Sequence, residues 1–173
     1  MYAQRAVSAS FALLAAFAAS GCDISLTDPD RRVTGDYDAL WLWYFEVPSL
    51  GIFDDGGCEG ILEITSQRGS DFSGRHRLTS FGACMPDRSG RVRGNVFSDG
   101  DFDMEVELED GRFGVFEAEP GCRFVRRDRR LEGRFRRGQI DAFAGAHLRC
   151  FLEGADRDVF VELDLLADER RRF

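Results

Sequence analysis

The chain has 173 residues, of which 43% are hydrophobic and 31% charged, a balance that argues against a disordered chain. Its length suits one domain with a single core. The 31 acidic residues outnumber the 23 basic ones, all of which are arginine, so the formal net charge is −8. A net acidic chain is a poor nucleic-acid binder, and we expect no nucleic-acid partner.

Residues 1–21 have the pattern of an export signal. Arg5 is the only charged residue before Asp23 and supplies a weak positive n-region. The run Ala6–Ala19 forms an apolar h-region of 14 residues, which is too short to span a bilayer comfortably. Small residues then lead to Cys22.

The sequence Ala19-Ser20-Gly21-Cys22 resembles the lipobox of bacterial lipoproteins. The resemblance implies that the signal is removed and that Cys22 is lipidated, anchoring the chain to a membrane of the cell envelope on the periplasmic side. The alternative is an ordinary secreted signal peptide with Cys22 as a bystander. Asp23 resembles the inner-membrane retention signal of enteric lipoproteins, and the choice between inner and outer membrane stays open. Residues 22–34 contain a proline and many polar groups and are predicted to form a tether.

Cysteine counting fits an exported chain. The five cysteines leave one without a partner if the others form disulfides. If Cys22 carries the lipid, Cys58, Cys84, Cys122 and Cys150 remain, enough for two disulfides in an oxidising compartment.

The rest of the chain predicts an all-β domain over residues 35–167, followed by a charged tail at 168–173. Glycines and charged turns punctuate short alternating runs, and no convincing helical period appears. The first run, "LWLWYFEV", is apolar on both faces. Tyr37, Trp41, Trp43 and Phe45 share one side, which we expect to fill the core. Leu40, Leu42 and Tyr44 share the other, which needs a covering segment or forms a ligand or partner surface.

The next hairpins follow from pairing faces of like polarity. Around Gly69-Ser70-Asp71, the predicted register places Arg68 opposite Phe72, Ile64 opposite His76 and Glu63 opposite Arg77. Around Asp99-Gly100-Asp101, it places Val92 opposite Leu108, Gly94 opposite Val106 and Val96 opposite Met104.

The remaining turns extend the same pattern. Asp110-Gly111 predicts a two-residue turn that pairs Leu108 with Phe113. Cys122–Arg130 breaks the alternation and is predicted to be a loop or irregular strand. Arg137-Gly138 pairs Phe135 with Ile140, and Val159–Leu165 forms the last strand with its odd-numbered residues inward.

Consecutive pairing of about eight strands leaves exposed edges unless the sheet closes, so we predict an antiparallel up-and-down barrel. Gly74, Gly94 and Gly133 recur on the inward side, where they permit strong curvature or leave space in the lumen. The topology favours the disulfides Cys58–Cys84 and Cys122–Cys150 among three possible connectivities. Each bridge would contribute about 3 kcal/mol in the chain-entropy model.

The opening Gly35-Asp36-Tyr37 and the hairpins "LEITSQRGSDFSGRHRL" and "GRVRGNVFSDGDFDMEVELEDGRF" resemble the calycin group of small barrels. That group contains lipocalin-like proteins, avidins and bacterial metalloprotease inhibitors. The resemblance implies either a small apolar or amphipathic ligand in the lumen, or an envelope protein bound by a barrel surface or loop. The lumen candidates are Trp41, Trp43, Ile64, His76, Met104, Phe113 and Phe135.

Other constellations have plainer interpretations. His76 is either a ligand contact or a hydrogen-bonded core residue, and with His147 as the only other histidine we expect no metal site. Asp99, Asp101 and Asp103 are spaced as in a calcium loop, but Met104 stands where the turn glycine belongs, which favours an acidic strand face. The eight arginines between Arg123 and Arg137 form a solvated charged face or meet lipid headgroups or an acidic partner. We find no enzyme signature and expect no cofactor; the oligomeric state stays open.

Overall fold

The computed structural model describes residues 32–79, 84, 89–117 and 120–170. Cys22, the export signal and the tether before Arg32 lie outside the described residues, as does the tail beyond Arg170. The described chain is almost entirely β-structure with one 3-10 turn, η2 (Pro48–Leu50). Its strands are β1 (Gly35–Val47), β2 (Ile52–Arg68), β3 (Asp71–Leu78), β4 (Gly90–Val96), β5 (Asp101–Glu107), β6 (Phe113–Gly114), β7 (Cys122–Arg127), β8 (Leu131–Arg136), β9 (Gln139–Leu152) and β10 (Ala155–Glu169).

Eight of these strands close into an antiparallel up-and-down barrel, as predicted. Each strand of the order β1-β2-β3-β4-β5-β8-β9-β10 pairs with the next, and β10 pairs back onto β1. The closing pair runs from Tyr37 opposite Glu169 to Glu46 opposite Phe160. This architecture is consistent with a lipocalin-like fold.

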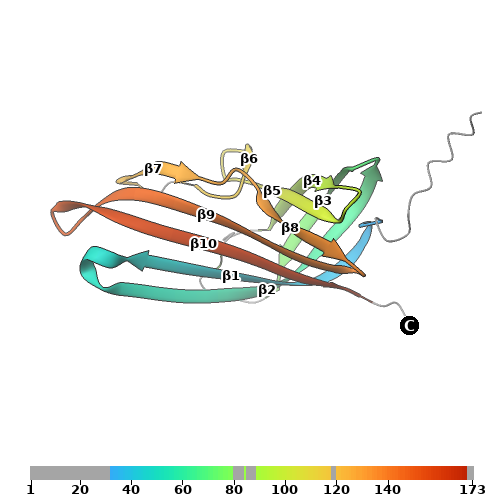
Figure 1. Cartoon of the computed structure of the whole chain (residues 1–173), viewed down its shortest axis with the longest axis horizontal. Helices are drawn as coiled ribbons and strands as arrows, with labels where there is room; N and C mark the ends of the chain where they lie inside the picture. The colour runs from blue at the N-terminus through green and yellow to red at the C-terminus, as the bar shows by residue number, and fades with distance from the viewer. Residues whose placement is uncertain (1–31, 80–83, 85–88, 118–119, 171–173) are drawn as a thin grey trace, which may run out of the picture.

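The barrel is strongly asymmetric in strand length (Figure 1). The four strands β1, β2, β9 and β10 have 13 to 17 residues, whereas β3, β4, β5 and β8 have 6 to 8. The long strands therefore extend beyond the barrel at one end, where β7 adds to the free edge of β9. β7 has an irregular register between Phe124 and Arg126, in agreement with the predicted irregular strand.

The β2–β3 hairpin keeps the predicted faces but shifts its pairing. Arg68 lies opposite Asp71 across a two-residue turn in which Gly69 has φ +62°. A bulge between Ile64 and Ser66 then places His76 opposite Leu62 rather than Ile64. Because the shift at His76 is two residues, its side chain still points inward.

Two later turns share a geometry that differs from the turns predicted from the sequence. In Ser98-Asp99-Gly100, glycine closes a three-residue loop at φ +87°, and the amide of Phe97 donates to the carbonyl of Asp101 at 2.8 Å. Glu109-Asp110-Gly111 repeats this arrangement with φ +78° at its glycine. A glycine at the last loop position supplies the left-handed residue of a turn followed by a bulge.

These turns move the two registers by different amounts. β4 and β5 slip by two residues, so Gly94 lies opposite Met104 and both faces are kept. β5 and β6 slip by one, which places Phe113 opposite Glu107 on the outer face. The predicted pairing of Phe113 with Leu108, and with it the placement of Phe113 in the lumen, is therefore wrong.

Other predictions are confirmed. Phe135 lies opposite Ile140 in the β8–β9 hairpin. In β10, the odd-numbered residues from Val159 to Leu165 are buried. β10 runs on to Glu169, past the predicted domain boundary at 167. The structure also contains both favoured disulfides, Cys58–Cys84 and Cys122–Cys150.

Three inward glycines permit the sharp bending of the short strands. A Cβ atom built at Gly94 would overlap the carbonyl oxygen of Asp103, and one at Gly133 would overlap that of Asp141. A Cβ atom built at Gly74 would likewise overlap the carbonyl oxygen of Glu63. Neighbouring backbones thus approach more closely than any side chain allows, so these glycines provide curvature rather than lumen space.

We expect Gly133→Ala to lower the free energy of unfolding by at least about 2 kcal/mol, because its methyl group would meet a backbone atom that cannot rotate away. Gly145→Ala in β9 is the matched control, since its Cβ has no neighbour closer than 3.6 Å. Urea unfolding of both variants measures the difference. Equal stability of the two variants would contradict the bending role.

Candidate functional site

The barrel interior is filled by its own side chains. Trp41 and Met104 have an exposed fraction of 0%, and Ile64, His76 and Phe135 are also buried. A side chain with no accessible surface borders no space large enough for water, so the layer around Trp41 and Met104 has no room for a ligand. Tyr37, Leu62, Leu131, Leu163 and Leu165 belong to the same fully buried set.

Two other lumen candidates lie elsewhere. Trp43 is half-buried and packs against the core. It lies opposite Gly56, beyond the β2 residues that pair with β3, and so at the end where the long strands extend past the short ones. Phe113 lies outside the barrel, with the guanidinium of Arg93 4.3 Å and that of Arg91 5.6 Å from its ring centroid. These contacts are favourable cation–π pairs on the outer face of β4.

His76 belongs to the core by its position, with its ring 5.4 Å from the ring of Trp41. It also borders a surface hollow of about 610 Å3. Charged side chains around that hollow pair with one another: Arg77 contacts Glu63 at 2.6 Å, and Arg91 contacts Glu107 at 2.6 Å.

The calcium-like spacing of the three aspartates does not bring their carboxylates together. Asp99 accepts a hydrogen bond from the amide of Asp101 at 3.1 Å, and this bond lowers the pKa of the Asp99 carboxyl. Asp101 pairs with Arg134 at 3.1 Å, whereas Asp103 accepts from Arg130 at 2.9 Å. Each carboxylate therefore serves a turn or an ion pair.

The outer faces of β3, β4, β5 and β8, here called the short-strand side, carry acids and arginines that neutralise one another. Arg93 pairs with Glu105 at 2.8 Å, and Arg130 reaches Glu105 as well as Asp103. Part of the arginine run from Arg123 to Arg137 is thus balanced by the acidic strand β5, as one of the two sequence interpretations predicted.

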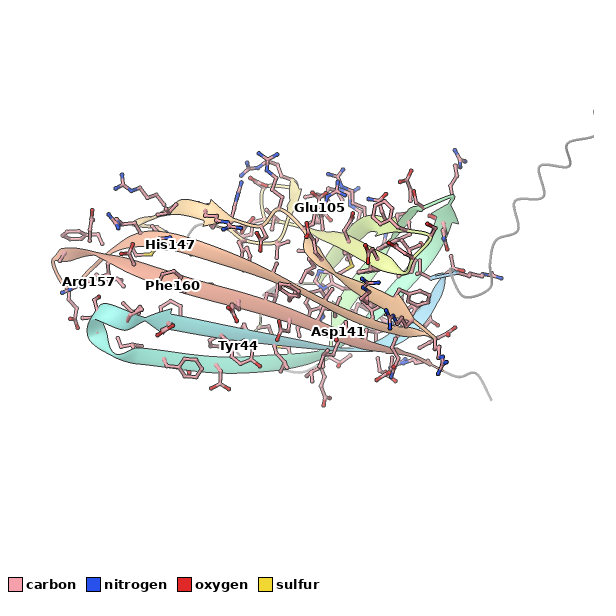
Figure 2. The ribbon with its side chains drawn as sticks, in the orientation of Figure 1. Tyr44, Glu105, Asp141, His147, Arg157 and Phe160 are labelled. Carbon is pink, nitrogen blue, oxygen red and sulfur yellow. A yellow bond between two sulfur atoms is a disulfide. The ribbon has the colours of Figure 1, made fainter. Side chains whose placement is uncertain are left out.

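The outer face of the four long strands has a different composition. The register aligns four rows of residues across β2, β1, β10 and β9, and we call them together the long-strand face. Figure 2 shows Tyr44, Asp141, His147 and Phe160 on these strands. The rows are Phe53, Glu46, Phe160, His147; Asp55, Tyr44, Glu162, Gly145; Gly57, Leu42, Asp164, Phe143; and Glu59, Leu40, Leu166, Asp141.

Large apolar side chains on this face are open to solvent. They are Phe53 (64%), Phe143 (62%), Phe160 (41%), Leu166 (41%) and Leu40 (37%). Exposed apolar side chains that gather on one face mark interaction surfaces. The outward side of β1, which the sequence predicted to need a covering segment or a partner, is thus continuous with exposed apolar residues from β2, β9 and β10.

The centre of the long-strand face is crowded with negative charge. Partial burial, and then the neighbouring carboxylates of Glu162 and Asp141, raise the pKa of the Asp164 carboxyl above its ordinary value. Among the described residues, none forms an ion pair with Asp164, Glu162 or Asp141. These acids are therefore available to an incoming positive charge.

At one edge of this face, His147, Asp158 and Arg149 form a cluster whose polar groups pair with one another. The imidazole of His147 stacks on Phe160 with centroids 4.6 Å apart, and its Nε2 lies 2.9 Å from Asp158. Arg149 donates to the same carboxylate at 2.8 Å. The hydrogen bond from Arg149, followed by that from His147, lowers the pKa of Asp158. Asp158 is thus committed to local partners, unlike the acids at the centre.

Sequence reasoning identified only the β1 part of the long-strand face. Phe143, Phe160 and Leu166 occupy outward positions of strands whose outward residues are expected to be polar. These apolar residues at polar positions were the sequence signal that could have revealed the rest of the face. Their gathering across β1, β10 and β9 depends on barrel closure.

No family model, curated protein or solved structure matches this chain. Over the described ranges, no helix is long and apolar enough to cross a membrane. The same residues contain no group of three or more histidine, cysteine or acidic side chains suited to hold a metal ion.

We expect Asp164→Asn to stabilise the protein at pH 7 by about 0.5 kcal/mol, because it removes a partly buried charge and the repulsion of that charge by Glu162 and Asp141. A carboxyl whose pKa is higher in the folded chain destabilises it increasingly as pH rises from the ordinary aspartate pKa through the raised one. The gain should therefore shrink as pH falls and vanish where the carboxyl is protonated in both states. Thermal unfolding from pH 3 to 8 measures it, with exposed Asp71→Asn as control; a gain independent of pH would contradict the mechanism.

Proposed function

We propose that this chain is a non-enzymatic lipoprotein of the cell envelope whose barrel binds another envelope protein through the long-strand face. The observation that carries the proposal is the gathering of exposed Leu40, Phe143, Phe160 and Leu166 on one continuous sheet face. A sheet face with this much apolar surface gains free energy when a partner removes it from water.

The proposed orientation follows from where the described chain begins. Val33 is buried just before β1, at the end of the barrel opposite the tips of the long strands, and its carbonyl accepts a hydrogen bond from Tyr37 Oη at 2.7 Å. Nine residues, 23–31, separate the proposed lipid anchor at Cys22 from Arg32. The ten steps from Cys22 to Arg32 can span about 35 Å when fully extended, so this end of the barrel would face the membrane. The tips of the long strands at Gly51 and Gly154 lie at the other end and would project into the periplasm (Figure 1).

The packed interior supports a surface function over a lumen function. A second candidate, a small apolar ligand, rests on the half-buried side chains Trp43, Phe45 and Phe124, which lie where the long strands extend past the short ones. Such a ligand would bind beyond the filled layer around Trp41 rather than within it. Native mass spectrometry of the purified protein distinguishes the candidates, because a lumen ligand should co-purify as added mass.

Cys22→Ser should move the protein from the membrane fraction to a soluble one with both disulfides retained, since neither involves Cys22. Cell fractionation followed by thiol labelling of the denatured, unreduced protein tests this. Continued membrane association of the variant, or newly reactive thiols, would contradict the anchor assignment.

Site-specific photo-cross-linking tests the partner surface in intact cells. With p-benzoylphenylalanine in place of Phe143, we expect a cross-link to one envelope protein identified by mass spectrometry. Phe97 is 45% exposed but lies in the turn after β4, and the same probe there should give no such product. The proposal fails if both positions yield the same products, or if position 143 cross-links only to lipid.

A further inference from the structure

The long-strand face combines exposed apolar side chains with acids but carries no arginine. Its four rows contain Glu46, Asp55, Glu59, Asp141, Glu162 and Asp164, and no position in these rows is an arginine. We propose that this face docks a basic, partly apolar segment of a protein partner, with one arginine or lysine side chain seated on Glu162 and Asp164. This inference rests on the proposed function and specifies the chemistry of the partner.

The two acids at the centre have apolar neighbours on both sides. Glu162 lies opposite Tyr44 on β1, and Asp164 lies opposite Leu42. On β9, Asp164 faces Phe143 and Glu162 faces Gly145. Phe160 and Leu166 continue the apolar surface along β10 in both directions.

This arrangement fits the two parts of a long basic side chain. Its charged end can meet the carboxylates of Glu162 and Asp164 while its methylene stem packs against Leu42 and Phe143. The rings of Tyr44 and Phe143 also offer faces to a cation. Apolar groups around a charge pair exclude water and strengthen the attraction. Removing either component should therefore weaken binding.

Five of the six acids of the face form no ion pair within the part of the chain that the structure describes. Glu46, Asp55, Asp141, Glu162 and Asp164 have no ion pair with any residue that the structure describes. The nearest paired acids mark the two ends of the face, Asp158 with Arg149 and Asp38 with Arg170. Partial burial and then repulsion from Glu162 and Asp141 raise the pKa of Asp164, and an incoming cation would relieve the repulsion.

The charge also decides between kinds of partner. An acidic face is repelled by the anionic headgroups of a membrane, although its exposed phenylalanines alone would suit a lipid surface. A basic protein segment satisfies both the apolar and the acidic components. Association with such a segment should be weakened by salt, because exposed charges are screened.

The experiment uses the mature chain from residue 22 carrying Cys22→Ser and two fluorescent twelve-residue peptides, one alternating arginine with leucine and one alternating glutamate with leucine. We expect the arginine peptide to bind at least tenfold more tightly at low salt. The double variant Glu162→Gln/Asp164→Asn should weaken its binding at least tenfold, whereas Asp71→Asn should leave it unchanged. Phe143→Ser should also weaken binding, with Phe97→Ser as its control.

Several results would overturn the inference. These are equal binding of both peptides, unchanged binding by the double variant, tighter binding to phosphatidylglycerol vesicles than to the arginine peptide, or self-association of the chain that Phe143→Ser abolishes. Folding is controlled within the design, because neutralising Asp164 is expected to stabilise the barrel. If position 143 still cross-links to an envelope protein while the double variant binds normally, the partner chemistry is wrong and the proposed function stands.

Discussion

The pairing of the first strand with the last is the constraint on which this structure depends. Without the contact of β1 with β10, the meander would be an open sheet with two long unpaired edges. Closure requires the short strands to bend sharply, and Gly94 and Gly133 permit this because their neighbours' carbonyls occupy the space of a side chain. In the interior that results, Trp41 and Met104 are fully buried.

The unequal strand lengths divide the surface into two chemistries. On the short-strand side, arginines and acids alternate and pair, as Arg93 does with Glu105. On the long-strand face, closure places β9, β10, β1 and β2 side by side, and their outward residues, apart from His147, are apolar or acidic. A paired charged surface is already satisfied by its own partners, whereas an apolar acidic one has free energy to gain from association. This contrast is the physical reason for placing the proposed function on the long-strand face.

Local rules predicted strand faces better than registers. Alternation identified which side of β2 and β4 is inward, and a slip of two residues leaves that assignment intact. Turn geometry decided the registers: the loop that ends at Gly100 lies one position earlier than expected, and the loop that ends at Gly111 begins one position earlier. A slip of one residue changed the face of Phe113. The slip of one residue at Arg68 is followed by the bulge between Ile64 and Ser66, which restores the predicted faces. The β8–β9 hairpin had a single plausible turn at Arg137-Gly138, and its register was predicted correctly.

By itself, the sequence determined the all-β class, the closed meander, the inward residues of most strands and the pairing of four cysteines. These follow from a period of two and from neighbours along the chain, which are local properties. Tertiary structure alone decided that the interior is packed and that Leu40, Leu166 and Phe143 become neighbours. Packing depends on how far strands bend, and the long-strand face joins strands more than a hundred residues apart in the chain. No periodic pattern within one strand records either property.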